Sequence, residues 1–146
     1  MLNISFAVQE SPIDVAHFLD ATEDEFYGAT SMFVGKVRNH DPQAGSEEVR
    51  GIEYTAHPNA SGVLEKEIGK LVREALKDED KATVTVVHRV GKLDVGDIAL
   101  LVIVATAHRH PGMDLVGQIV EKVKKVLPVW KKQNLTNGDA KWSNLP

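Results

Sequence analysis

The chain has 146 residues and a mass of 16.0 kDa, which predicts a single domain spanning residues 1–146 with one buried core. Apolar residues make up 42% of the sequence and charged residues 26%, proportions that are ordinary for a globular protein and favour neither a disordered nor a fibrous class. The absence of cysteine excludes disulfides, thiolate metal ligands, a cysteine nucleophile and a persulfide formed on this chain. If the protein handles sulfur, a partner must bring it.

Charge is spread unevenly along the chain. Residues 1–102 hold 10 Lys and Arg against 18 Asp and Glu, and residues 103–146 hold 7 against 3, for a formal net charge of −4. This balance argues against general nucleic-acid binding. The longest apolar run, residues 98–107, is about half of the ~20 residues that a membrane-spanning helix needs, and no secretory signal is visible. We therefore expect a cytoplasmic protein that does not bind membranes.

The first half of the chain predicts strands separated by two helices. Residues 3–10 have the composition of a strand, and residues 11–21 predict a helix with Ser11 as its N-cap and Pro12 at its first position. Two further strands and an amphipathic helix are predicted at residues 29–38, 49–57 and 61–77.

The second half predicts a hairpin followed by a helix. Residues 82–93 and 97–108 are rich in β-branched side chains and are joined at Asp94–Asp97, where Gly96 favours a turn. From Met113 to Trp130 the apolar residues are spaced as on one face of a helix. The order strand, helix, two strands, helix, two strands, helix predicts an α+β domain with helices on a largely antiparallel sheet.

The last predicted helix carries lysines at two kinds of position. At about 100° per residue, Lys124 lies about 70° and Lys131 about 50° from the centre of the apolar stripe, so both should border the buried face. The same geometry turns three others by about 130° to 170°, toward solvent: Lys122, Lys125 and Lys132. Proline can kink or end a helix, so this placement holds only if the helix continues past Pro128, a condition that matters more for Lys131 than for Lys124.

Cations also follow or end the predicted strands. They form three sets: Lys36, Arg38 and His40; His88, Arg89 and Lys92; and His108, Arg109 and His110. If the strand ends converge, these sets could form a basic pocket, because the guanidinium fork of arginine matches carboxylate and phosphate groups. Each histidine alone is more often structural. The spacing predicts no metal site, and no phosphate-binding glycine loop or other cofactor motif occurs.

Taken together, several segments resemble the large, catalytic subunit of molybdopterin synthase. They cover nearly the whole chain in the order of that family: FVGKVRNH at 33–40, VTVVHRVGKLDVGD at 84–97, VATAHRH at 104–110, KKVLPVWKKQ at 124–133 and NGDAKW at 137–142. The resemblance implies a fold like the α/β-hammerhead. It also implies a homodimer in which each copy binds one small ubiquitin-like subunit, a heterotetramer overall.

The activity implied by this resemblance is sulfur transfer without a bound cofactor. In that family the small subunit inserts a C-terminal Gly-Gly tail that ends in a thiocarboxylate. The acceptor is cyclic pyranopterin monophosphate, also called precursor Z, which receives two sulfurs and becomes the dithiolene of molybdopterin. The resemblance thus makes the chain a sulfurtransferase of molybdenum cofactor biosynthesis.

Carried over position by position, the family's functional residues fall on five residues of this chain. Lys124 and Lys131 are the expected catalytic lysines: Lys124 beside the incoming acyl carbon, and Lys131 where it stabilises developing negative charge. Arg38, His108 and Arg109 are the expected contacts of the substrate phosphate and pterin. The residues leave open whether Lys124 also attacks covalently and which sulfur is added first.

The sequence departs from the family pattern in three places. Gly112 and Met113 stand where the family commonly has Ala-Phe, and Gln133 stands where an acidic residue often follows Trp-Lys-Lys. The sequence ends at Pro146, whereas many relatives continue into a basic tail. Lys141 is the only cation left to substitute for that contact, and the sequence leaves open whether it does.

One alternative comes from a different class, a non-catalytic module that binds a phosphorylated ligand or an acidic protein tail with the same basic surface. Lys124→Arg separates the two hypotheses, because a binding module needs only the charge whereas an aligned catalytic lysine needs its own geometry. A nucleic-acid binder is a distant third hypothesis, since stacking aromatics and overall positive charge are lacking.

Overall fold

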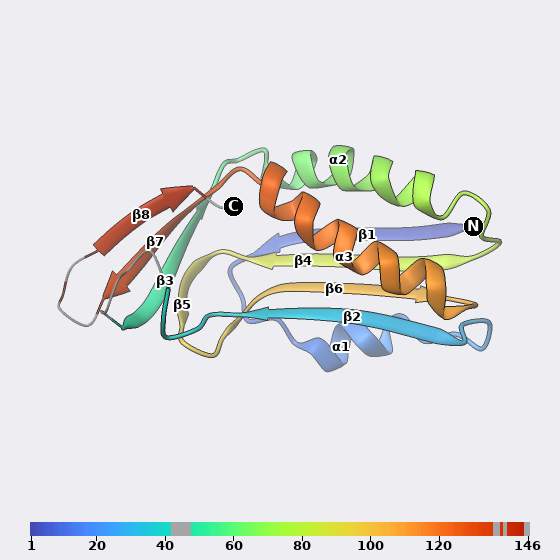
Figure 1. Ribbon diagram of the computed structural model, residues 1–146, viewed down its shortest axis with the longest axis horizontal. Coiled ribbons are helices and arrows are strands. Elements are labelled where there is room, and N and C mark those ends of the chain that lie inside the picture. The colour runs from blue at the N-terminus through green and yellow to red at the C-terminus, as the bar shows by residue number, and fades with distance from the viewer. Residues whose placement is uncertain (42–47, 136–137, 139, 145–146) are drawn as a thin grey trace.

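The computed structural model describes residues 1–41, 48–135, 138 and the backbone of 140–144 (Figure 1). The elements in chain order are β1 (Leu2–Gln9), α1 (Val15–Asp20), β2 (Ala29–Lys36), β3 (Val49–Ala56), α2 (Ala60–Ala75), β4 (Ala82–Arg89), β5 (Gly91–Asp94), β6 (Ile98–Thr106), α3 (Arg109–Val126), β7 (Val129–Leu135) and β8 (Ala140–Asn144).

The strands form two four-stranded sheets. The first has the order β1-β4-β6-β2 and the second the order β5-β3-β7-β8. Only β1 and β4 pair in parallel among the pairings of the described strands, and the other pairs are antiparallel. The predicted α+β class with a largely antiparallel arrangement is therefore confirmed, although two sheets are present in place of one.

Helices cover both faces of the first sheet (Figure 1). On one face α3 packs on β2 and β6 and α2 packs on β1, with Val102 and Val104 of β6 in the larger hydrophobic core cluster. On the other face Leu101 and Ile103 meet apolar side chains of α1. Because neighbouring positions of β6 are buried on opposite faces, the strand reads as a nearly unbroken aliphatic run.

The predicted hairpin of residues 82–108 is confirmed, and it contains an extra strand. β4 and β6 pair antiparallel, with Ala82 opposite Thr106. Between them the chain leaves the first sheet, adds β5 to the second sheet beside β3, and returns. Gly91 and Gly96 bracket this excursion with φ of 87° and 92°, values that glycine adopts without steric cost.

The last helix does not extend to Trp130, so of the outcomes that the sequence left open at Pro128, the helix ends there. α3 ends at Val126, and Leu127 has an extended conformation with ψ of 118°. The cause is Pro128, because a residue that precedes proline is sterically driven out of the helical region. The chain then forms β7 and β8, which the helical spacing did not predict.

The predicted start of the first helix is also wrong. Ser11 and Pro12 lie before α1, which begins at Val15 after the N-cap Asp14, whose carboxylate accepts a hydrogen bond from the backbone N–H of His17 at 3.2 Å. Between these two residues and the N-cap, Ile13 is buried in the core. None of the described helices combines the length and apolar character needed to cross a membrane.

Candidate active site

The strand-end cations lie at two opposite ends of the first sheet. In the antiparallel pairing of β2 with β6, Ala29 lies opposite Thr106 and Lys36 lies opposite Ile98. Arg38 follows one end of this ladder, and His108 and Arg109 follow the other. The length of β6 separates the two ends by about 27 Å at 3.4 Å per residue. A single basic pocket within one chain, as the sequence suggested, is therefore excluded.

Arg38 is held where the two sheets meet. The backbone of its neighbour Val37 donates to the carbonyl of Asp97 at 2.9 Å and accepts from the N–H of Gly96 at 2.7 Å. The next residue, Asn39, accepts from the N–H of Val49 at the start of β3. These bonds fix the backbone on both sides of Arg38 and leave its side chain exposed.

Lys124 lies in the last turn of α3, at the end of the helix that adjoins the second sheet (Figure 1). The hydrogen bond from the N–H of His57 to the carbonyl of Pro128 joins this helix end to β3. Lys124 is exposed, and so is Lys125.

The predicted contrast between Lys124 and the solvent-facing lysines is wrong, because Lys124 is exposed, as Lys125 is. Lys122, which was expected in solvent, is half-buried and lies 3.9 Å from the carboxylate of Glu67 on α2. Lys132 was also expected in solvent and is half-buried on β7.

Lys131 lies on β7, not on a helix as predicted. It is opposite Tyr54 of β3, and its side chain is 16% exposed. Its ammonium nitrogen lies 3.8 Å from a carboxylate oxygen of Asp41. The same oxygen accepts a hydrogen bond from the amide of Gln133, two residues further along β7. Lys131 therefore borders a buried surface, although the strand and not a helix puts it there.

Next to Lys131 the second sheet meets the first through two buried rings. Tyr54 of β3 contacts His88 of β4 edge to face, with ring centroids 5.1 Å apart. Burial raises the pKa of Tyr54 to about 12 and lowers the pKa of His88 to about 4, because each ring loses the water that would solvate its charged form. Both rings are therefore neutral at pH 7. His88 carries its proton on Nδ1, which donates to the carbonyl of Arg89 at 2.7 Å.

Arg89 is a structural residue in this arrangement. Its guanidinium pairs with the carboxylate of Asp97 at 3.1 Å and donates to the carbonyl of Glu10 at 3.2 Å. The same carboxylate oxygen of Asp97 accepts from the N–H of Asp94 at 2.9 Å. Arg89 and Asp97 flank β5, so their ion pair joins the two ends of the segment that contains this strand.

At the opposite end of the sheet, His108, Arg109 and His110 begin α3. All three side chains are exposed, and His108 makes no side-chain capping bond. Nearby, Gly112 is buried and Met113 is 59% exposed. This end offers an open cationic surface at the start of a helix, where the backbone N–H groups also favour an anion.

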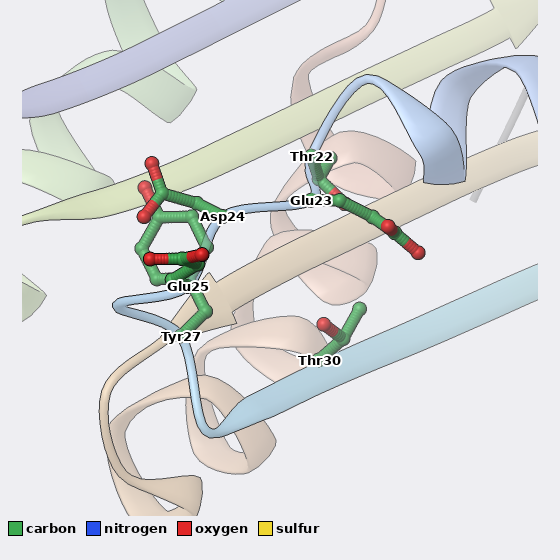
Figure 2. Close-up of a pocket in the computed structure, with 6 residues that line it drawn as sticks. All are labelled: Thr22, Glu23, Asp24, Glu25, Tyr27 and Thr30. Carbon is green, nitrogen blue, oxygen red and sulfur yellow. The ribbon is translucent and has the colours of Figure 1, made fainter.

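A pocket of about 520 Å³ lies at this same end, in the loop that precedes β2 (Figure 2). It is lined by Thr22, Glu23, Asp24, Glu25, Tyr27 and Thr30. Asp24 pairs with Lys81, which lowers the pKa of that carboxyl group. With three carboxylates in its lining, this pocket repels a phosphate and is unsuited to the predicted substrate.

Sequence reasoning missed Asp41 and Tyr54, and it noted Gln133 only as a departure from the family pattern, without a role in the site. The sequence of β7, VWKKQNL, does contain a strand pattern, because every second residue belongs to one face: Val129, Lys131, Gln133 and Leu135. The helical spacing of the preceding apolar residues concealed this pattern. Lys141 lies on β8, whose side chains are outside the described part of the chain.

The fold and the site define a class of protein. A two-sheet α+β domain carries Arg38, Lys124 and Lys131 at the end of its first sheet that adjoins the second sheet, where the buried rings of Tyr54 and His88 are neutral. Such a surface belongs to a protein that binds an anionic ligand at the junction of its sheets.

Comparison with known proteins identifies the family. The sequence model of the MoaE protein family matches residues 8–126. A relative from Haemophilus influenzae, named molybdopterin synthase catalytic subunit, is 36% identical over 95% of this chain and 89% of its own. Molybdopterin synthase from Staphylococcus aureus superposes with a TM-score of 0.78 at 26% identity, covering 93% of this chain and 94% of that chain. A complex of subunits 1 and 2 of molybdopterin-converting factor from Helicobacter pylori shares the fold, with a TM-score of 0.70 at 20% identity over 97% and 89% of the two chains.

The chain belongs to the MoaE protein family. Its function is that of a molybdopterin synthase catalytic subunit, a component of an enzyme of molybdenum cofactor biosynthesis.

Proposed function

We propose that this chain transfers sulfur from the C-terminal thiocarboxylate of a small ubiquitin-like subunit to cyclic pyranopterin monophosphate, forming the dithiolene of molybdopterin. The observation that carries the proposal is the position of Lys131, a half-buried cation at the junction of helix α3 and the second sheet. The cysteine-free sequence is consistent with it, because sulfur then has to arrive on a partner. Membership of the MoaE family favours this enzyme over a non-catalytic binding module.

In this proposal the two lysines have different tasks. Lys124 is exposed in the last turn of α3, where an incoming peptide tail can reach it, and it orients the thiocarboxylate. Lys131 is 16% exposed, so its charge is less screened by water and stabilises negative charge that develops during transfer. Trp130, 53% exposed on the same strand, is a candidate contact for the small subunit, since exposed aromatic side chains are common in interfaces.

The proposed substrate contacts lie too far apart for one copy of the chain to bring them together. Arg38 lies at the same end of the first sheet as the two lysines, whereas His108 and Arg109 lie at the other end. We propose that the protein is a homodimer in which one copy supplies Arg38 and the partner copy supplies His108 and Arg109 to the same pterin phosphate. With one small subunit bound to each copy, the assembly is a heterotetramer.

Reconstitution tests the proposal directly. The purified chain is mixed with cyclic pyranopterin monophosphate and a small subunit that carries either a thiocarboxylate or an ordinary carboxylate. We expect mass spectrometry to detect the dithiolene product only with the thiocarboxylate. Formation of the product by the chain alone with a low concentration of inorganic sulfide would contradict the proposal. The reaction is also proposed to be cytoplasmic, which fractionation of cells producing the tagged chain would test.

A further inference from the structure

We propose that Asp41 is a positioning residue that holds the Lys131 ammonium in place, with Gln133 fixing the carboxylate. This inference rests on the catalytic role proposed above for Lys131. Asp41 follows β2 by five residues, and Lys131 and Gln133 lie on β7, so segments distant in sequence meet here. One oxygen of the Asp41 carboxylate serves both partners, lying 3.8 Å from the Lys131 nitrogen and accepting a hydrogen bond from Gln133.

Burial makes this arrangement more rigid than a surface ion pair. The side chains of Lys131 and Asp41 are 16% and 14% exposed, and Gln133 is 4% exposed. Exposed ion pairs are weak because water screens the charges and long side chains lose freedom on pairing. Here the amide of Gln133 already immobilises the carboxylate, and the strand immobilises Gln133. The carboxylate therefore presents a fixed point toward which the flexible lysine side chain is drawn.

The distance between the two charges has a functional meaning. At 3.8 Å the ammonium of Lys131 is attracted to Asp41 but lies beyond the ~2.7 to 3.2 Å range of an N–H to oxygen hydrogen bond. The carboxylate orients the ammonium without engaging its N–H groups. Those groups can then donate to an oxygen or sulfur that becomes negative during the transfer.

Gln133 is suited to this task because it is neutral. Its amide donates to Asp41, whereas a carboxylate at this position would repel Asp41. Lys131 and Gln133 are two residues apart on one strand face, about 7 Å between α-carbons, so a carboxylate at position 133 could also reach the lysine. The pair needs one carboxylate and one amide, and exchanging them should preserve the function.

The test compares Asp41→Asn, Gln133→Glu and the double variant Asp41→Asn/Gln133→Glu, each assayed with the thiocarboxylated small subunit and the pterin precursor. We expect each single variant to lower kcat about tenfold to a hundredfold with KM nearly unchanged. The reason is that a displaced Lys131 impairs the transfer step and not the binding of the substrate. The double variant should recover most of the parent's kcat. Asp114→Asn, at an exposed position of α3, is the matched control and should behave as the parent does.

A second measurement does not depend on turnover. The rate at which an amine-acylating reagent modifies Lys131 is followed by peptide mass spectrometry on the dimer without the small subunit. Asp41→Asn should increase that rate several-fold, because the released side chain is open to the reagent, and the double variant should restore the parent rate. Labelling of Lys124 serves as the internal control and should not change.

The outcomes separate this inference from the proposed function. Equal labelling of Lys131 in all variants, or a double variant as slow as Asp41→Asn, would overturn the positioning role. Full turnover by Lys131→Ala would instead refute the catalytic role of that lysine, while the labelling experiment would still decide whether Asp41 holds it.

Discussion

Two adjacent lysines in the last turn of α3 offer a matched comparison at the level of single side chains. Lys124 and Lys125 are both exposed, so either truncation should change the free energy of unfolding by less than about 0.5 kcal/mol. Lys124→Ala should nevertheless lower the rate of sulfur transfer about a hundredfold to a thousandfold, because a cation placed at developing charge is lost. Lys125→Ala should leave the rate nearly unchanged. Single-turnover assays measure both, and equal losses would refute the role assigned to Lys124.

The buried His88 gives the protein a pH-dependent stability. Its folded pKa of about 4 lies below the ordinary value of 6.5, so between these pH values the unfolded chain binds more protons at this residue. The contribution is complete above pH 6.5 and is lost as the pH falls toward 4. The loss of unfolding free energy from this residue between pH 7 and pH 5 is roughly 2 kcal/mol.

Urea unfolding at pH 7 and pH 5 tests this contribution. The parent should lose more stability than His88→Gln, whose side chain does not titrate, and the exposed control His110→Gln should lose as much as the parent does. Identical losses in the parent and in His88→Gln would show that the imidazole of His88 is protonated in the folded state.

For Lys131, the sequence predicted its position at the border of a buried surface but not the element that carries it. The two periodicities overlap here, because positions 123, 127 and 130 continue a helical stripe while positions 129, 131, 133 and 135 alternate as in a strand. Asp41 was not predictable, since its contact with Lys131 depends on how the segment that follows β2 lies against β7. Side-chain partners that join distant segments leave no local pattern.

Among the helices, α3 carries two glycines with opposite surroundings. A Cβ atom at Gly112 would lie 3.2 Å from the hydroxyl oxygens of Ser31 and Thr106, where the helix packs on β2 and β6. A Cβ atom at Gly117 would have no heavy atom within 4 Å. Gly117→Ala should therefore stabilise the fold by about 0.5 to 1 kcal/mol, because alanine favours the helix and restricts the unfolded chain.

Gly112→Ala should lack this gain and destabilise the fold, since the helix must move away from the sheet to make room. Thermal melts of the two variants beside the parent give the comparison. Equal changes in Tm for the two variants would show that the contact of Gly112 with the sheet does not limit how closely α3 packs.

The end of α3 also marks the limit of sequence-based prediction for the elements. The helices on the sheet and the pairing of β4 with β6 were predictable, because their apolar residues follow one period over long segments. β5 has four residues inside an apparently continuous hairpin, too few to show a period of its own. The second sheet therefore could not be recognised from the sequence, and neither could the end of the first sheet that adjoins it, where Arg38, Lys124 and Lys131 lie.

For the molecule as a whole, the separation of Arg38 from Arg109 leads to a test of shared sites. Each substitution by alanine should weaken binding of the pterin precursor more than it weakens folding, because both side chains are exposed. In a dimer that mixes the two variants, one site contains both substitutions and the other contains neither. Random mixing makes half of the dimers mixed, so activity should return to about a quarter of the parent value.

Coproduction of the two inactive chains, followed by the reconstituted sulfur-transfer assay, measures this recovery. Chains that both carry Arg38→Ala are the control and should stay inactive. No recovery in the mixed sample would mean that each site is built from one copy.

The β5 excursion also makes the two sheets thermodynamically interdependent. β5 belongs to the second sheet, while β4 and β6 on either side of it in the chain belong to the first. Unfolding of either sheet therefore displaces strands of the other. Both tryptophans of the chain, Trp130 and Trp142, lie on strands of the second sheet, whereas α2 and α3 cover the first. Fluorescence and far-ultraviolet circular dichroism therefore report on different halves, and we expect their denaturation curves to coincide in one cooperative transition. Two separated midpoints would show that the halves unfold independently.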